Sequence, residues 1–185
     1  IVLEGELLSR HTVLGIGGPA AFFVTAEDAS DIASAVAVAR ARRLPWVILG
    51  AGSNALVSAR GFPGMVIRPT GAAIRPSADG FVADAGVAMA RLVAESVSFG
   101  LTGFEWAIGV PGTVGGSVRG NAGCFGSEMS GVLRSVTVLN AETGGIEEWS
   151  VTDWATAVTG ELGEACNAIK KLRRIECGAQ NINEP

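Results

Sequence analysis

The order of hydrophobic and polar positions predicts strands alternating with helices in the first 100 residues. Small residues in GIGGPA predict a turn, and the apolar run that follows completes a turn and strand at 14–25. A helix is expected next, because Ile32, Ala35, Val36 and Ala39 recur at helical spacing. Short apolar runs then predict further strands, at 46–49, 65–68 and 81–85.

The pattern continues more loosely toward the middle of the chain. A second helix is expected at 88–99, followed by a long glycine-rich stretch at 103–126. Alternating residues at 132–139 predict a half-buried strand, and 146–149 is expected to pair back on it as a hairpin. This order of elements indicates an α+β (α/β) fold in two small lobes joined near 68–80.

The pattern becomes helical after about residue 150. Apolar residues step by three and four from Trp154 to Leu172, which predicts an amphipathic helix with basic residues at its end. We therefore expect one lobe at 1–68, a second at 69–150 and a helical tail of different origin at 151–185. The apolar stripe of this tail has no evident partner, so it is expected to dock loosely or to promote self-association.

Charge and cysteine content exclude several classes of function. The net charge of −4 gives no reason to expect binding to nucleic acid or to an anionic membrane. The three cysteines have no paired spacing, which argues against a disulfide framework or a zinc site. No apolar run is long enough to cross a bilayer, and IVLEGELLSR does not read as a signal peptide. We expect a cytoplasmic protein.

Two glycine-rich segments are candidates for binding an anionic cofactor. Gly50–Asn54 directly follows a predicted strand, and glycines there would let backbone N–H groups surround phosphate oxygens. The second segment, IGVPGTVGGSVRGNAGCFG at 108–126, carries little charge besides Arg119. The alternatives are a tight strand-to-loop turn for the first segment, and packed turns or a glycine-rich helix-helix contact for the second. His11 is the only histidine, and a lone histidine is more often structural than catalytic.

Three motifs together resemble the UDP-N-acetylenolpyruvoylglucosamine reductase family, also called UDP-N-acetylmuramate dehydrogenase. They are HTVLGIGGPA, LGAGSNALVS and GFEWAIGVPGTVGGSVRGNAGCFG, and the resemblance covers roughly residues 8–149. It implies the two-lobed FAD-binding fold of the vanillyl-alcohol-oxidase/PCMH type, without the family's C-terminal substrate domain. It also implies hydride transfer from NADPH, through the flavin, to the enolpyruvyl carbon of a UDP-sugar during peptidoglycan precursor synthesis.

The same resemblance implies which residues contact FAD. The pyrophosphate would lie on the first glycine loop, and two parts of the second glycine segment would line the remaining cleft. The expected cofactor-binding residues are Gly50, Ala51, Gly52, Ser53, Asn54, Pro111, Gly112, Thr113, Gly115, Gly116, Asn121, Ala122 and Gly123. No metal ligand is expected in this part of the chain, and the oligomeric state is left open.

The chain departs from the family after Trp149. The family's catalytic Arg follows in a Tyr-Arg-x-Ser-like segment, and this chain contains no tyrosine, so no catalytic residue is assigned. The tail instead resembles the first helix of all-α NTP pyrophosphohydrolases, in which acidic pairs bind magnesium. Glu161 and Glu164 are one such pair. A non-catalytic FAD-binding module and a fragment of a Mg-dependent pyrophosphohydrolase are therefore the alternatives to an incomplete reductase.

Overall fold

The computed structural model describes residues 1–77 and 80–151. The chain divides into two compact units, the first formed by Ile1–Leu133 and Thr137–Glu147, the second by Arg134–Val136 and Glu148–Pro185. Apart from the hairpin at the end of the described chain, all contacts considered below join residues of the first unit. The predicted lobe boundaries stay predictions, and the predicted tail helix lies outside the described residues.

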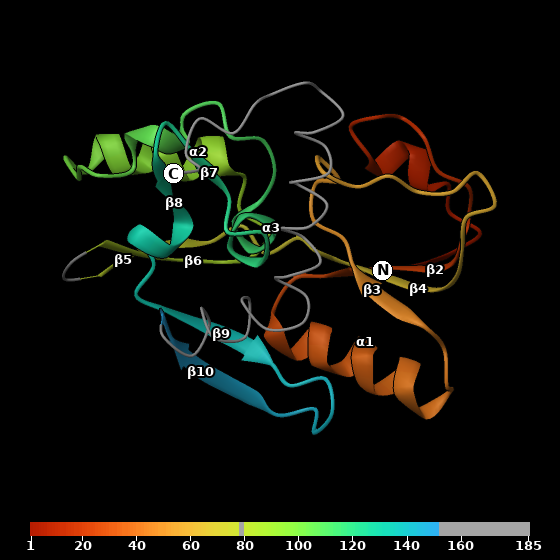
Figure 1. Cartoon of the computed structure of the whole chain (residues 1–185). Coiled ribbons are helices and arrows are strands. Elements are labelled where there is room, and N and C mark those ends of the chain that lie inside the picture. The colour runs from red at the N-terminus through yellow and green to blue at the C-terminus, as the bar shows by residue number, and fades with distance from the viewer. Residues whose placement is uncertain (78–79, 152–185) are drawn as a thin grey trace, which may run out of the picture. The chain divides into compact units, whose positions relative to one another are not determined.

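A four-stranded sheet forms the first part of the chain (Figure 1). Its members are β1 (Val2–Glu4), β2 (Ala20–Ala26), β3 (Trp46–Ile48) and β4 (Phe62–Pro69), in the order β1-β2-β4-β3. Strand β1 is antiparallel to β2, whereas β2, β4 and β3 are parallel. The carboxyl ends of the three parallel strands therefore meet at one edge, where loops of open α/β sheets commonly bind ligands.

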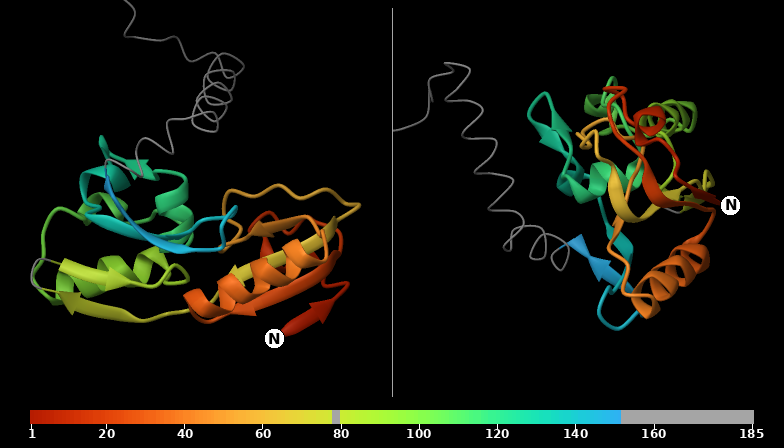
Figure 2. Two further views of the ribbon diagram at one scale, coloured as in Figure 1. Left: turned by 90° about the horizontal axis from the view of Figure 1, so that it is seen from below. Right: turned by 90° about the vertical axis from the view of Figure 1, so that its right-hand side faces the viewer.

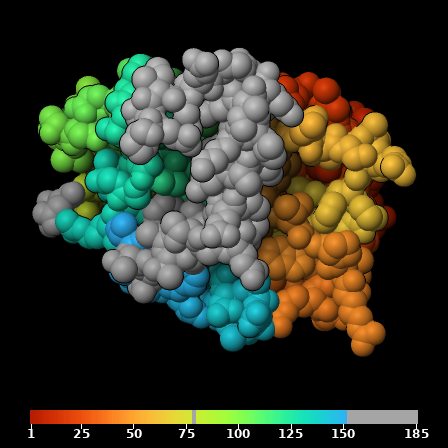
Figure 3. Space-filling view, viewed as in Figure 1, coloured from red at the N-terminus to blue at the C-terminus, as the bar shows by residue number. Residues whose placement is uncertain are grey.

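Helix α1 (Ala29–Ala41) connects β2 to β3 and covers one face of this sheet, as Figure 2 shows from below. The Asp28 carboxylate accepts a hydrogen bond from the Asp31 amide at 2.9 Å, so Asp28 caps the start of the helix. The outer face of the helix, orange in Figure 3, forms part of the molecular surface.

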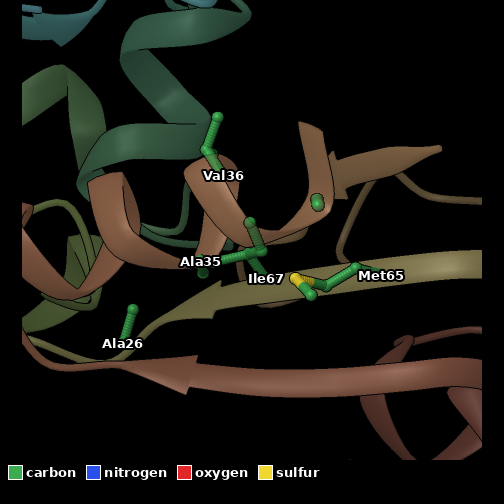
Figure 4. Packing of buried hydrophobic residues seen from close by; sticks show 6 residues of the cluster. Ala26, Ala35, Val36, Met65 and Ile67 are labelled. Atoms are coloured by element: carbon green, nitrogen blue, oxygen red, sulfur yellow. The ribbon is translucent and has the colours of Figure 1, made fainter. Parts of the chain in front are cut away.

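The strands β2 and β4 are buried on both faces. On one face Met65 and Ile67 belong to a buried cluster with Ala35 and Val36 of α1. Figure 4 shows Ala35 beside Ile67, whereas the Val36 side chain points away from the strands. On the other face Val66 packs with Phe23 and with Leu8 of a short 3-10 helix, Leu8–His11. The alternation of Met65, Val66 and Ile67 between faces follows from the two-residue period of a strand. Buried apolar residues thus fix the sheet that carries the first glycine loop.

The second half of the chain is built from short elements around a separate core. They are β5 (Ile74–Ser77), β6 (Gly80–Ala83), α2 (Met89–Ser98), a 3-10 turn (Glu105–Ala107), α3 (Val114–Arg119), β7 (Gly123–Cys124), β8 (Ser127–Glu128) and a 3-10 turn (Met129–Gly131). Strands β5 and β6 pair as one hairpin, and β7 and β8 as another. Met89, Val93, Trp106, Ala107 and Met129 form the core.

Strands β9 (Ser135–Leu139) and β10 (Ile146–Ser150) form the predicted hairpin at the end of the described residues. Their turn is closed by Asn140, whose amide donates to the Gly145 carbonyl at 2.8 Å. The Asn140 side chain accepts from the amides of Glu142 and Thr143. An asparagine that bonds the backbone two and three residues ahead is typical of a tight turn.

Candidate functional site

The first glycine loop, residues 50–54, leaves the sheet at the carboxyl end of β3. The Leu49 amide donates to the Ile67 carbonyl at 2.9 Å, which anchors the start of the loop to β4. Gly52 is buried and has a φ of 68°, a conformation that side chains other than glycine rarely adopt. A Cβ atom at Gly52 would lie 2.1 Å from the His11 carbonyl oxygen, so only glycine fits here.

The backbone N–H groups of this loop are the feature that suits an anion. Within residues 1–77 and 80–151, none of the N–H groups from Gly50 to Asn54 donates a hydrogen bond to another described residue. The side chains of Ser53 and Asn54 likewise have no hydrogen bond in this part of the chain. Successive free amides in a turn form a concave donor surface for phosphate or carboxylate oxygens.

The second glycine segment contains α3, which the sequence alone did not predict. The Thr113 hydroxyl caps this helix by accepting from the Gly116 amide at 3.4 Å. The amides of Val114 and Gly115 donate to the carbonyls of Val87 and Ala85, at 2.8 and 2.9 Å. These first-turn amides already have protein acceptors. Gly115 and Gly116 can therefore help a ligand to bind only because they have no side chain that would occupy its place.

The two glycine segments meet. A Cβ atom at Gly50 would lie 2.7 Å from the Thr113 hydroxyl oxygen, and one at Gly112 would lie 2.9 Å from the Ser53 hydroxyl oxygen. The contacts are reciprocal, with each loop placing a hydroxyl against a glycine of the other. The structure therefore brings Gly50–Asn54 and Pro111–Thr113 together, although they are about 60 positions apart in the sequence.

Asn121, Ala122 and Gly123 lie at the far end of α3 and are held by different partners. The Asn121 side chain accepts from the Ser130 amide at 3.0 Å. Ala122 donates to the Ser117 carbonyl and accepts from the Met129 amide, and Gly123 belongs to β7. These hydrogen bonds attach the β7–β8 hairpin to α3, so the backbone groups of Asn121 and Ala122 are mostly used within the protein.

His11 lies beside the first loop in a polar network. Its Nε2 is 3.0 Å from Glu6 Oε1, its Nδ1 is 2.8 Å from the Arg68 guanidinium, and its ring stacks on Phe23 at a centroid distance of 4.1 Å. The structural role predicted for this histidine agrees with these contacts. Glu6 and Arg68 were not expected at the site, since no local pattern relates Arg68 to a histidine 57 positions earlier.

Two hollows elsewhere in the first unit do not include the facing loops. One, of about 430 Å³, is lined by Trp106 and by residues of the β7–β8 hairpin and the turn after it. The other, of about 480 Å³, lies between β1 and α1 and is mostly apolar. The candidate site therefore depends on the backbone groups of the loops and not on either of these hollows.

The described residues were also compared with the requirements of a metal site and of a membrane-spanning helix. Among the described residues, no group of three or more His, Cys, Asp or Glu side chains is arranged to hold a metal ion. No helix in the same part of the chain is long and apolar enough to cross a membrane. Glu161 and Glu164, the acidic pair of the tail, lie outside the described residues.

Comparisons with known proteins address the fold and the cofactor class. A curated relative, the UDP-N-acetylenolpyruvoylglucosamine reductase of Saccharopolyspora erythraea, is 39% identical over 163 residues, covering 85% of this chain and 44% of the relative. The chain spans about half the length of the curated relatives it matches.

Solved structures give the same result. The UDP-N-acetylenolpyruvylglucosamine reductase from Thermus caldophilus superimposes with a TM-score of 0.68 at 35% identity, covering 82% of this chain and 54% of that one. A 6-hydroxy-D-nicotine oxidase from Arthrobacter nicotinovorans shares the fold alone, with a TM-score of 0.57 at 21% identity over 72% of this chain and 31% of that one.

The predicted resemblance and the predicted fold class are both confirmed by these relatives. The family model described as "FAD binding domain" matches residues 20–150, which include both glycine loops and the sheet that carries the first of them. This match covers most of the chain, and it shows that the protein belongs to the family of FAD-binding domains.

Proposed function

We propose that this chain is the FAD-binding portion of an NADPH-dependent UDP-N-acetylenolpyruvoylglucosamine reductase. Membership of the FAD-binding family supports FAD as the cofactor, and the names of the relatives support the reductase reaction. The single observation that carries the proposal is the row of N–H groups at Gly50–Asn54, which have no acceptor among the described residues. A diphosphate is the part of FAD that such a row of donors suits.

The residues present fit this cofactor. Gly50–Asn54 would hold the pyrophosphate through backbone amides, with Ser53 and Asn54 as further donors. Side chains at Gly50 and Gly112 would collide with the hydroxyl groups of the facing loop, at 2.7 and 2.9 Å. Both glycines thus allow the two loops to approach each other closely. Pro111–Thr113, Gly115, Gly116 and Asn121–Gly123 would line the rest of the cofactor site.

The cofactor and the protein would have different roles in the reaction. Bound FAD would supply the redox centre for hydride transfer from NADPH to the enolpyruvyl group of the UDP-sugar. The residues named above bind and orient that cofactor. No residue of this chain is given the role of polarising the substrate carboxylate or of donating the final proton. A cytoplasmic location is part of the same proposal.

The alternative function is an FAD-binding module without turnover. It is favoured by one observation, namely that the family model matching residues 20–150 is described as an FAD binding domain and names no reaction. Both readings require bound FAD, and they differ in whether NADPH reduces it. The pyrophosphohydrolase alternative depends on residues of the tail alone, and nothing in the described part of the chain supports it.

The visible absorbance spectrum of the purified 185-residue chain tests the proposal. After addition of FAD and removal of free cofactor, we expect a protein-bound flavin band that is lost on anaerobic addition of NADPH. FMN is the matched control, because it lacks the pyrophosphate and adenosine of FAD and should be retained far less well. A bound flavin that NADPH does not reduce would support the non-catalytic module, and no retained flavin would contradict both readings.

A further inference from the structure

The contacts of His11 fix which of its ring nitrogens carries the proton. The Arg68 guanidinium has only donors, so His11 Nδ1, at 2.8 Å, must accept. The hydrogen of the neutral ring is then on Nε2, which donates to Glu6 Oε1 at 3.0 Å. The ring is therefore held by one acidic and one basic partner, and stacking on Phe23 limits its tilt.

The main chain next to this ring holds the first glycine loop. The His11 carbonyl lies against Gly52, where a Cβ atom would approach it to 2.1 Å. Two residues later, the Val13 amide donates to the Gly52 carbonyl at 3.1 Å. Residues 11–13 thus contact Gly52 through a close approach and through a hydrogen bond. Any rotation of the His11 backbone would move the loop with it.

Strand β4 also contributes to this arrangement, through Arg68. Arg68 is the next-to-last residue of β4, and its side chain reaches His11 from the sheet edge where the loop begins. An apolar side chain at position 11 would also pack on Phe23. Directional bonds to Glu6 and Arg68 additionally set the ring angle, and through it the position of the backbone that touches Gly52.

We propose that Glu6, His11 and Arg68 are positioning residues that hold the loop at 50–54 in the conformation that receives the cofactor's pyrophosphate. This inference rests on the proposed function for the identity of the ligand. It assigns the three side chains an effect on FAD affinity without any contact with FAD. The apparent dissociation constant rises in inverse proportion to the fraction of molecules whose loop is correctly placed.

Two substitutions at His11 separate the two halves of the network. His11→Asn places an amide oxygen near the position of Nδ1, so it can keep the hydrogen bond from Arg68 while losing the hydrogen bond to Glu6. His11→Gln can place an amide nitrogen near the position of Nε2. It then keeps the hydrogen bond to Glu6 and loses the hydrogen bond from Arg68. Arg10→Gln is the matched control, because Arg10 pairs with the other carboxylate oxygen of Glu6, Oε2, at 3.6 Å from an exposed position where an ion pair contributes little.

We expect each His11 substitution to weaken FAD binding by about tenfold, as for a lost hydrogen bond to a charged group. Arg10→Gln should leave the affinity unchanged. Binding of riboflavin, which has no pyrophosphate, should change much less than binding of FAD. Flavin fluorescence titration at a temperature far below each variant's midpoint gives these values, and a variant that loses only global stability would retain the wild-type affinity for FAD.

Hydrogen exchange of the cofactor-free chain provides a readout that needs no ligand. The Val13 amide reports the contact with Gly52 directly, so its exchange should speed up in both His11 variants, whereas the core amide of Met65, bonded to Pro45, should not. Unchanged Val13 exchange, or unchanged FAD affinity in folded variants, would overturn the inference. If the wild type retains no FAD, the proposed function fails, and Val13 exchange still decides whether the network holds the loop.

Discussion

Gly52 combines three requirements at the level of a single residue. It is buried and has a φ of 68°. A Cβ atom at this position would also lie too close to the His11 carbonyl oxygen. The left-handed conformation and the collision are separate costs for any other residue. A close approach of two backbone segments is a common reason for a glycine that follows a strand.

We therefore predict that Gly52→Ala destabilises the protein by about 3 kcal/mol, from backbone strain plus displacement of the His11 segment. Gly131→Ala is the control, because Gly131 has no positive φ and nothing lies within 4 Å of a Cβ there. Urea denaturation followed by circular dichroism measures both. Equal stability of the two variants would mean that the approach of Gly52 to His11 is not essential to the fold.

The positions of the glycine loops were predictable from sequence, but their contact was not. Clustered glycines after an apolar run indicate a backbone-built loop whatever the remainder of the chain does. The reciprocal contacts of Gly50 with Thr113 and of Gly112 with Ser53 depend on how distant segments pack. The bonds from His11 to Glu6 and Arg68 depend on the same packing, so a lone histidine gave no sign of its partners.

At the level of elements, local patterns predicted α1 and α2 better than the short elements of the second half. Apolar spacing identifies α1, which has the expected buried face and ends before Pro45. Helix α3 was missed because glycines at positions 115 and 116 suppress any helical pattern, although Thr113 provides a cap. Strands β7 and β8 have two residues each, too few for alternation to be recognised.

The buried face of α1 permits a matched pair of core substitutions. Val36 is 1% exposed and belongs to the buried cluster around α1, whereas Val38 on the same helix is 45% exposed. Val36→Ala should cost about 2 kcal/mol, through lost burial and a residual cavity. Val38→Ala should change stability by less than about 0.5 kcal/mol, because alanine favours a helix and little is buried.

Chemical denaturation of the two variants side by side checks this pair. Helix content in the native state should be the same for both, so a difference in the midpoint reports the burial of Val36 and not helix propensity. A Val38→Ala variant as unstable as Val36→Ala would indicate that the Val38 side chain, which lines the hollow between β1 and α1, is covered in solution.

At the level of the whole molecule, the cofactor should be part of what stabilises the fold. The two facing glycine segments touch mainly through glycines and hydroxyl groups, so little apolar surface holds them together. Exposed apolar side chains on neighbouring loops, among them Leu14, Leu56 and Ile108, add no packing in the cofactor-free chain. A ligand whose phosphates bind one segment and whose remainder contacts the other would link them.

FAD should accordingly raise the free energy of unfolding by mass action, since the unfolded chain has no organised site. At a free FAD concentration about a hundred times the dissociation constant, the gain is about 2.7 kcal/mol. Thermal unfolding at increasing FAD should show a midpoint that climbs steadily, while riboflavin at equal concentration produces a much smaller rise. Gly50→Ala, whose Cβ atom would lie 2.7 Å from the Thr113 hydroxyl oxygen and displace it, should lower the midpoint without cofactor and respond less to FAD. A midpoint that FAD leaves unmoved would show that the two facing loops do not bind FAD, because tight binding to the native state alone must stabilise it.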